Sequence, residues 1–276
     1  MKKLRFIYRM EIQFSSPVNS HYFALRCIPG DCSRQRIALT EQNIYPADYL
    51  ARTKDGFGNI RLSGCCQGPH ETFGYTIAGT ALTRGMEAVK EPLHPMYRYP
   101  SAYTRPVPEI AVFAGKAEKL CRKLGKKQNL EKAVCVMGML YEGFSYVPGS
   151  TDISTTAGEA LKQGKGVCQD YAHIMTAVLR YMGIPARYVA GLMIGEGYTH
   201  AWVEVYTRDG WYGLDPTNNL HIDEYYIKLA HGRDYGDCVT DRGCFCGTAG
   251  QVQKIYVKVE EIKNDGNSGG NETAGG

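Results

Sequence analysis

The stretch GKGVCQDYAHIMTAVLRYMG, residues 164–183, sets one cysteine between a glycine-rich turn and an apolar run with helical spacing. Apolar side chains recur every three or four residues after Cys168, and Gly183 with Pro185 beyond it is a helix stop. This pattern predicts a helix over residues 167–182 with Cys168 in its first turn. Free N–H groups and aligned peptide dipoles at a helix start stabilise an anion, and the thiolate is the nucleophilic form of cysteine. Cys168 is therefore the candidate nucleophile among ten cysteines.

The composition is typical of a soluble globular protein. The chain has 276 residues, of which 43% are hydrophobic and 22% charged, and no apolar run is long enough to span a bilayer. The net charge of +4 is small and no basic block interleaves with aromatic residues, so we expect neither a membrane nor a nucleic-acid partner. Charges interrupt the first fourteen residues, which lack the apolar centre of a secretory signal. The expected location is the cytoplasm, with reduced cysteines.

The first part of the chain has the alternation of β-strands. Even positions from Leu4 to Phe14 are apolar and odd ones are mostly polar, and similar short segments separated by turn residues follow up to about residue 95. A proline-rich stretch then interrupts every period. We therefore predict an all-β domain over residues 1–95, a linker over 96–108, a second domain over 109–262, and a disordered glycine-rich tail over 263–276.

The second domain mixes helices and strands. Apolar spacing predicts helices over residues 110–124 and 130–144, and a short third helix near Thr155, capped by Ser154 or Thr155 with Glu159 close behind. Strand-like segments follow the helix of Cys168, over residues 186–195, 200–208, 210–217 and 252–261. The expected fold class is α+β, with an all-β domain preceding helices packed on an antiparallel sheet.

His200 and Asp215 are the candidate partners of Cys168. His173 is excluded because five residues along a helix place it about 140 degrees around the axis from Cys168. His200 opens a strand, and Asp215 ends the next one. A two-residue turn at Asp209 and Gly210 would put Asp215 opposite Glu204, about 13 Å along the sheet from His200. The alternation thus places His200 and Asp215 on the same face of the sheet, but it does not bring them into contact. A bulge or an earlier turn would do so.

A zinc or redox site is a weaker alternative for the later cysteines. Cys238, Cys244 and Cys246 lie close together in the sequence, and His231 precedes them. Their spacing matches none of the paired patterns that close a tetrahedral site. We therefore expect no metal and no cofactor.

The segments GVCQDYAH, GIPARYVAG, THAWVEV and GWYGLDPTNN together resemble the bacterial transglutaminase-like superfamily, a papain-like group with Cys, His and Asp in this order. The first domain is similar to the β-rich N-terminal region often fused to that branch. The resemblance implies that Cys168 is the nucleophile, His200 the base and acid, and Asp215 the residue that orients His200. It implies an oxyanion site formed by the Cys168 N–H together with Gln163 or Tyr146. Trp202 either lines the cleft or fills the sheet, and no calcium loop matches the animal members.

Our hypothesis from the sequence is a cysteine-dependent amide or peptide hydrolase or acyl transferase that works through a thioester, with hydrolysis favoured. The resemblance supplies the substrate class, a peptide or protein amide. The alternative is a binding module that keeps the fold without catalysis. Three intact catalytic candidates favour the enzyme, and the oligomeric state is left open.

Overall fold

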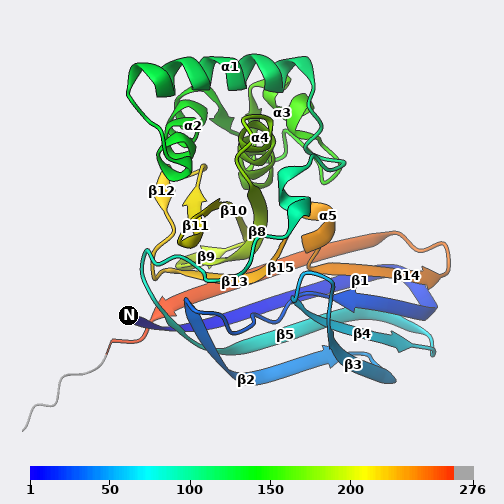
Figure 1. Cartoon of the computed structure of the whole chain (residues 1–276). Coiled ribbons are helices and arrows are strands. Elements are labelled where there is room, and N and C mark those ends of the chain that lie inside the picture. Colours follow the sequence, from blue (N-terminus) through cyan, green and yellow to red (C-terminus); the bar gives the residue numbers. More distant parts are fainter. Residues whose placement is uncertain (264–276) are drawn as a thin grey trace, which may run out of the picture.

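The computed structural model describes residues 1–263 and shows an eight-stranded sheet below a five-stranded sheet that carries the helices (Figure 1). The long strand β1 (Lys2–Leu25) is central to the large sheet, because it pairs with β5 and β15 along its first half and with β4 and β14 along its second. The other strands of this sheet are β2 (Gln35–Tyr45), β3 (Tyr49–Lys54), β4 (Ile60–Cys66), β5 (His70–Thr83), β9 (Gly195–Gly197), β14 (Asp241–Cys246) and β15 (Gln251–Glu261). The predicted α+β class with a β-rich N-terminal region is confirmed.

The predicted domain boundary at residue 262 does not follow the sheets. The last two strands, β14 and β15, pair with β1 and complete the N-terminal sheet, although they were assigned to the second domain. Alternation of apolar and polar residues identifies a strand but not its partner, and these partners are more than 200 residues apart. Apart from Lys263, the predicted tail lies outside the described residues.

The smaller sheet is antiparallel and has the order β12 (Leu220–His221), β11 (Gly210–Asp215), β10 (His200–Thr207), β8 (Ala186–Met193), β13 (Tyr226–Gly232). Most of the helices lie on the side of this sheet that is turned away from the eight-stranded sheet (Figure 1). They are η1 (Pro95–Arg98), α1 (Pro108–Lys123), α2 (Asn129–Gly143), α3 (Ala157–Gln163), α4 (Cys168–Tyr181) and α5 (Tyr235–Cys238).

The three long helices, α1, α2 and α4, begin and end within two residues of the predictions. The cap of α3 is Thr156 rather than Ser154 or Thr155, and its hydroxyl accepts from the Glu159 N–H. Within residues 1–263 we find no helix with the length and apolarity of a membrane span.

Helix α4 is the centre of the second core. Most of its side chains are buried, and it contacts α1, α2 and α3 as well as β10. The face of β10 turned to the helices carries Ala201, Val203 and Val205, all of which join this core. Burying such small and branched side chains against one helix fixes the height and rotation of α4 on the sheet. The first residue of α4 is therefore held in one place.

The stretch predicted as a linker packs against the second domain. Val89 forms a β-bridge with Trp211, and Tyr97 of η1 packs edge-on against the same indole. Val89, Tyr97 and Trp211 are all buried and form a small core of their own. The prolines interrupt the sequence periodicity, but Tyr97 between them is fixed by packing, whereas Tyr99 is exposed.

Two amide side chains join the sheets at the edge strand β13. Gln35 donates to the Lys228 carbonyl and accepts from the Lys228 N–H, both at 2.8 Å. Asn59 makes the same pair of bonds with His231, both at 2.9 Å. Each amide thus supplies the bonds that a neighbouring strand would make to an edge. The N-terminal sheet is therefore attached to the five-stranded sheet by specific hydrogen bonds as well as by apolar contacts.

Candidate active site

The local structure around Cys168 fixes the start of α4. The short strands β6 (Ser145–Tyr146) and β7 (Lys165–Gly166) pair in parallel just before it. Within the first turn, the Asp170 carboxylate accepts hydrogen bonds from the Val167 N–H at 2.7 Å and from the Thr151 hydroxyl at 2.6 Å. A side chain at Gly166 would collide with this carboxylate, so the glycine is required there. Asp170 thus has the structural role that its position in the first turn suggests.

His200 and Asp215 are in direct contact. The Nε2 atom of His200 lies 2.7 Å from Oδ2 of Asp215. The expected register was wrong, because Thr207 pairs with Gly210 and the turn is formed by Arg208 and Asp209. This earlier turn places Gly213 opposite Glu204 and moves the end of β11 two residues closer to His200. Gly210 looked like a turn residue in the sequence, but it begins the strand with a φ of 125°.

Asp215 is fully buried and surrounded by donors. Its Oδ1 accepts from the backbone N–H groups of Thr217 and Asn218, at 2.9 and 3.2 Å. Its Oδ2 accepts from the Asn218 amide at 2.8 Å and from the Tyr226 hydroxyl at 2.9 Å. Burial alone would raise the pKa of Asp215, but the bond to His200 and these donors outweigh it and lower the pKa. The carboxylate therefore stays ionised.

Sequence reasoning missed Tyr226 and the role of Asn218. Asn218 belongs to the turn that begins at Asp215, where the Asp side chain binds backbone N–H groups two and three residues later, a pattern readable from the letters DPTNN. Tyr226 gives no such signal, because it lies in β13, at the opposite edge of the sheet order from β11 and β12. Only the folded sheet brings its hydroxyl to the carboxylate.

The imidazole of His200 is held in its charged form. Burial lowers the pKa of His200, but the hydrogen bond to Asp215 and the negative charge of that carboxylate, together with the neighbouring Cys168, outweigh it and raise the pKa to about 10. Since Nε2 faces Asp215, the other ring nitrogen, Nδ1, is the one available to the sulfur. An imidazolium between a carboxylate and a thiol favours the thiolate.

Cys168 and His200 line one cavity of about 550 Å³. Its lining combines the start of α4 and residues of β8 and β10 with the segments 238–243 and 251–255. Cys168 is partly exposed in this cleft, whereas Asp215 lies behind His200 without exposed surface. A substrate carbonyl entering the cavity thus meets the sulfur first, at a helix start whose N–H groups have no intrahelical partners.

Comparisons with known proteins agree with this geometry. The family model described as transglutaminase-like superfamily matches residues 118–216, and the bacterial transglutaminase-like N-terminal region matches residues 4–81. The uncharacterized protein Rv2569c of Mycobacterium tuberculosis is 32% identical over 298 residues, which is 95% of this chain and 94% of that protein. The chain belongs to the transglutaminase-like superfamily.

Further similarities extend over different parts of this transglutaminase-like chain. A crystal structure from Cytophaga hutchinsonii, provisionally named a cysteine protease, superposes with a TM-score of 0.74 at 23% identity and covers 96% of this chain and 92% of that one, which shows the shared fold. A protein-glutamine gamma-glutamyltransferase of Pseudomonas aeruginosa is 35% identical over 92 residues, only 28% of this chain and 14% of that protein.

Three other residues were predicted for the site of this transglutaminase-like chain, namely Tyr146, Gln163 and Trp202, and the structure gives each of them a different place. Tyr146 is 52% exposed and does not line the cavity, although partial burial and, after it, the nearby Cys168 raise its pKa. Gln163 is exposed at the end of α3 and does not line the cavity. Trp202 is 1% exposed and packs edge-on against Tyr226, so it fills the sheet behind the site and does not line the cleft.

The cysteines of the alternative zinc site do not gather. Cys238 is buried in α5, whereas Cys244 and Cys246 are exposed on β14. His231 is mostly buried beside Glu91. In the part of the chain that the structure describes, no three His, Cys, Asp or Glu side chains are grouped as metal ligands.

Proposed function

We propose that this protein is a cysteine-dependent amide or peptide hydrolase of the transglutaminase-like type, which acts through a thioester formed on Cys168. One observation carries the proposal. The imidazole of His200, bonded at 2.7 Å to a buried carboxylate, shares a solvent-accessible cavity with a cysteine at a helix start. This arrangement supplies the nucleophile, the proton donor and the orienting group that acyl transfer requires.

The first half of the reaction follows from the proton on the imidazole. The Cys168 thiolate attacks the amide carbonyl carbon, forming a C–S bond and an oxyanion, which backbone N–H groups at the start of α4 stabilise. Collapse of this intermediate breaks the C–N bond, and the His200 imidazolium gives its proton to the leaving amine. The products of this half are a free amine, a thioester on Cys168 and a neutral imidazole.

The second half returns the proton. Neutral His200 takes a proton from water, whose oxygen attacks the thioester carbonyl; the C–S bond breaks, and the carboxylic acid leaves while thiolate and imidazolium re-form. A primary amine in place of water would give a new amide and make the enzyme a transferase. Cys168 is partly exposed in its cleft, so water has access to the thioester. This access favours hydrolysis.

The test is turnover of a peptide library in water enriched with oxygen-18, with and without an added primary amine, followed by mass spectrometry. Hydrolysis places one heavy oxygen in the acid product, whereas transfer adds the amine. We expect the Cys168→Ala variant to show no turnover while it keeps its fold. The matched variant Cys135→Ala, which alters a partly buried cysteine of α2, should keep full activity. Unchanged turnover in Cys168→Ala would contradict the proposal.

A further inference from the structure

The cavity that is lined by Cys168 is also lined by one arginine. Arg242 lies in β14, exposed, and it is the only Lys or Arg among the residues that line the cavity. Asp241, the neighbouring residue, is the only Asp or Glu in that lining. These two residues therefore decide the charge of the lining outside the proposed catalytic residues.

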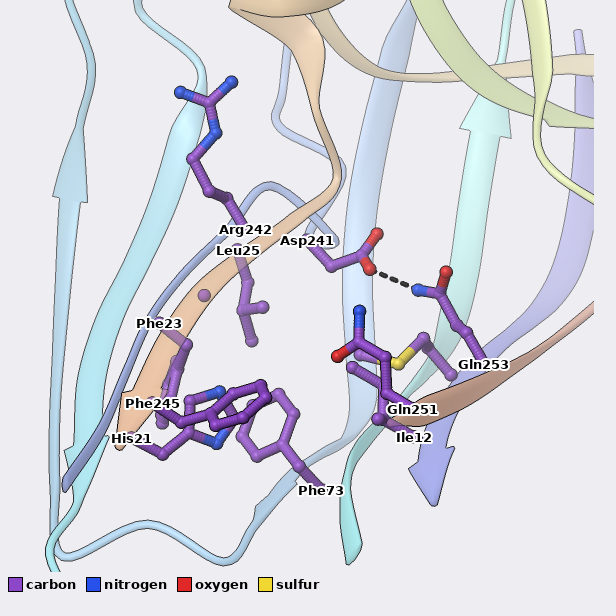
Figure 2. Close-up of a pocket in the computed structure, with 12 residues that line it drawn as sticks. Ile12, His21, Phe23, Leu25, Phe73, Asp241, Arg242, Phe245, Gln251 and Gln253 are labelled. Carbon is purple, nitrogen blue, oxygen red and sulfur yellow. Dashed lines mark hydrogen bonds between the residues drawn. The ribbon is translucent and has the colours of Figure 1, made fainter. Parts of the chain in front are cut away.

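The two side chains point in different directions. The Asp241 carboxylate accepts hydrogen bonds from Gln253 and from the Thr240 hydroxyl. Figure 2 shows this carboxylate turned toward Gln253, at the edge of a small second cavity of about 90 Å³, whereas the Arg242 side chain extends away from it. Asp241 is also partly buried, and burial raises its pKa. The carboxylate is therefore satisfied within the lining and does not neutralise Arg242.

Arg242 lines the cleft, and its guanidinium has no partner among the residues that the structure describes. Within residues 1–263 it makes no ion pair and donates no hydrogen bond to another side chain or carbonyl. Burial raises the pKa values of Tyr103 and Tyr235, and the positive charge of Arg242 acts against this rise in both. Both tyrosines line the same cavity as Cys168, so the charge lies on the cleft side of β14.

We propose that Arg242 recognises a carboxylate of the acyl donor, so that the preferred substrates are peptides with an acidic side chain or a free carboxylate near the amide that is cleaved. This inference rests on the proposed function and names its substrate class. A guanidinium binds a carboxylate with two parallel hydrogen bonds, which gives both attraction and orientation. Apart from Asp241, Cys168 and His200, the rest of the cavity lining is aromatic, aliphatic or neutral polar. Arg242 is therefore the cation of the lining that lies outside the proposed catalytic residues.

The experiment compares two alkylating probes at Cys168, anionic iodoacetate and neutral iodoacetamide, at low ionic strength. Peptide mapping by mass spectrometry isolates the rate at Cys168 from those of the other cysteines. The variants are Arg242→Gln, Arg242→Glu and the matched control Arg52→Glu, which makes the same charge change on the exposed strand β3. The positive charge of His200 attracts iodoacetate equally in wild type and in all three variants. The ratio of the iodoacetate rate to the iodoacetamide rate therefore measures the effect of the charge of Arg242.

We expect the rate ratio of iodoacetate to iodoacetamide to fall about twofold or more in Arg242→Gln, and further in Arg242→Glu, with no change in Arg52→Glu. An equal ratio in all four proteins would overturn the inference. Peptides with Glu, Gln or Lys beside the amide supply a second readout, in which wild type should prefer Glu and Arg242→Glu should prefer Lys. If wild type cleaves no peptide, the proposed function fails, while the alkylation ratio still decides on Arg242.

Discussion

Nε2 of His200 lies 2.7 Å from Oδ2 of Asp215, a carboxylate with no exposed surface. Because that carboxylate also accepts four other hydrogen bonds, its position is set by the protein before any substrate arrives. The imidazole is thereby held with Nδ1 toward the cleft. Asp215, Asn218 and Tyr226 do not line the cavity, so this network holds the imidazole from behind.

Replacing Asp215 by Asn should lower turnover without abolishing it. An amide in place of the carboxylate removes the negative charge that stabilises the imidazolium and leaves His200 poorly oriented, while Cys168 stays in place. We expect kcat to fall by about 10²- to 10⁴-fold, measured on whichever peptide wild type cleaves best. Activity equal to that of wild type would show that Asp215 does not orient His200.

Tyr226→Phe tests the part of the network that the sequence did not reveal. The change removes one donor to Asp215 while keeping the ring that packs on Trp202. We expect about a tenfold loss of kcat/KM and a loss of about 1 kcal/mol in the free energy of unfolding. The matched variant Tyr225→Phe removes a hydroxyl bonded to Glu261 at 3.0 Å, away from the site, and should keep full activity. Equal activity in both variants would remove Tyr226 from the positioning network.

The charge on His200 should persist well above neutral pH. Its pKa of about 10 lies above the ordinary value near 6.5. The stability that the imidazolium contributes is therefore complete below about pH 6.5 and is lost as the pH rises through about 10. Turnover should fall over the same upper range, because the leaving amine loses its proton donor. Nitrogen-15 NMR of the imidazole measures this titration directly, and a midpoint below pH 7 would contradict the assignment.

Glu204 should dominate acid sensitivity in the smaller sheet. This buried carboxylate lies 2.6 Å from Arg187 and 3.1 Å from Lys228. Burial would raise its pKa, but both cations outweigh it and lower the pKa from about 4.5 to about 2. Its stabilisation is therefore present above about pH 4.5 and is lost as the pH falls toward 2.

Glu204→Gln should destabilise the fold by about 3 kcal/mol at neutral pH, because Lys228 loses its carboxylate partner and the buried Arg187 keeps only Glu91, at 2.7 Å. The control Glu260→Gln breaks an exposed pair with Lys258 and should change the free energy of unfolding by less than about 1 kcal/mol. Urea titrations of both variants provide the measurement. Equal effects would show that the buried network adds nothing beyond a surface pair.

The sequence predicted the helices and the three candidate residues, of which the structure brings His200 and Asp215 into contact and places Cys168 in the same cavity as His200. Local periodicity determines the ends of α1, α2 and α4, since each depends on residues within a few positions of each other. The face shared by His200 and Asp215 also followed from alternation. The contact between His200 and Asp215 could not be predicted in the same way. Moving the turn by one residue, from Asp209-Gly210 to Arg208-Asp209, shifts the pairing of the two strands by two residues, and the sequence alone does not decide between these turns.

Long-range pairing accounts for what could not be predicted. The strand β15 was predicted as a strand and β14 was not. Nothing local indicates that the two strands pair with β1 and contribute to the lining of the cavity that contains Cys168. Tyr226 reaches Asp215 only because β13 folds back beside β8. From the sequence, Trp202 was equally compatible with a position in the cleft and one in the core. The structure places it in the core, packed against Tyr226.

The alkylation rate of Cys168 at pH 6 tests the central claim most directly. Wild type and a His200→Ala variant are treated with iodoacetamide, and modification of Cys168 is followed by peptide mapping. We predict that wild-type Cys168 reacts about 100-fold faster than free cysteine at this pH and that His200→Ala removes most of this difference. A wild-type rate equal to that of free cysteine, unchanged by the loss of His200, would contradict the account.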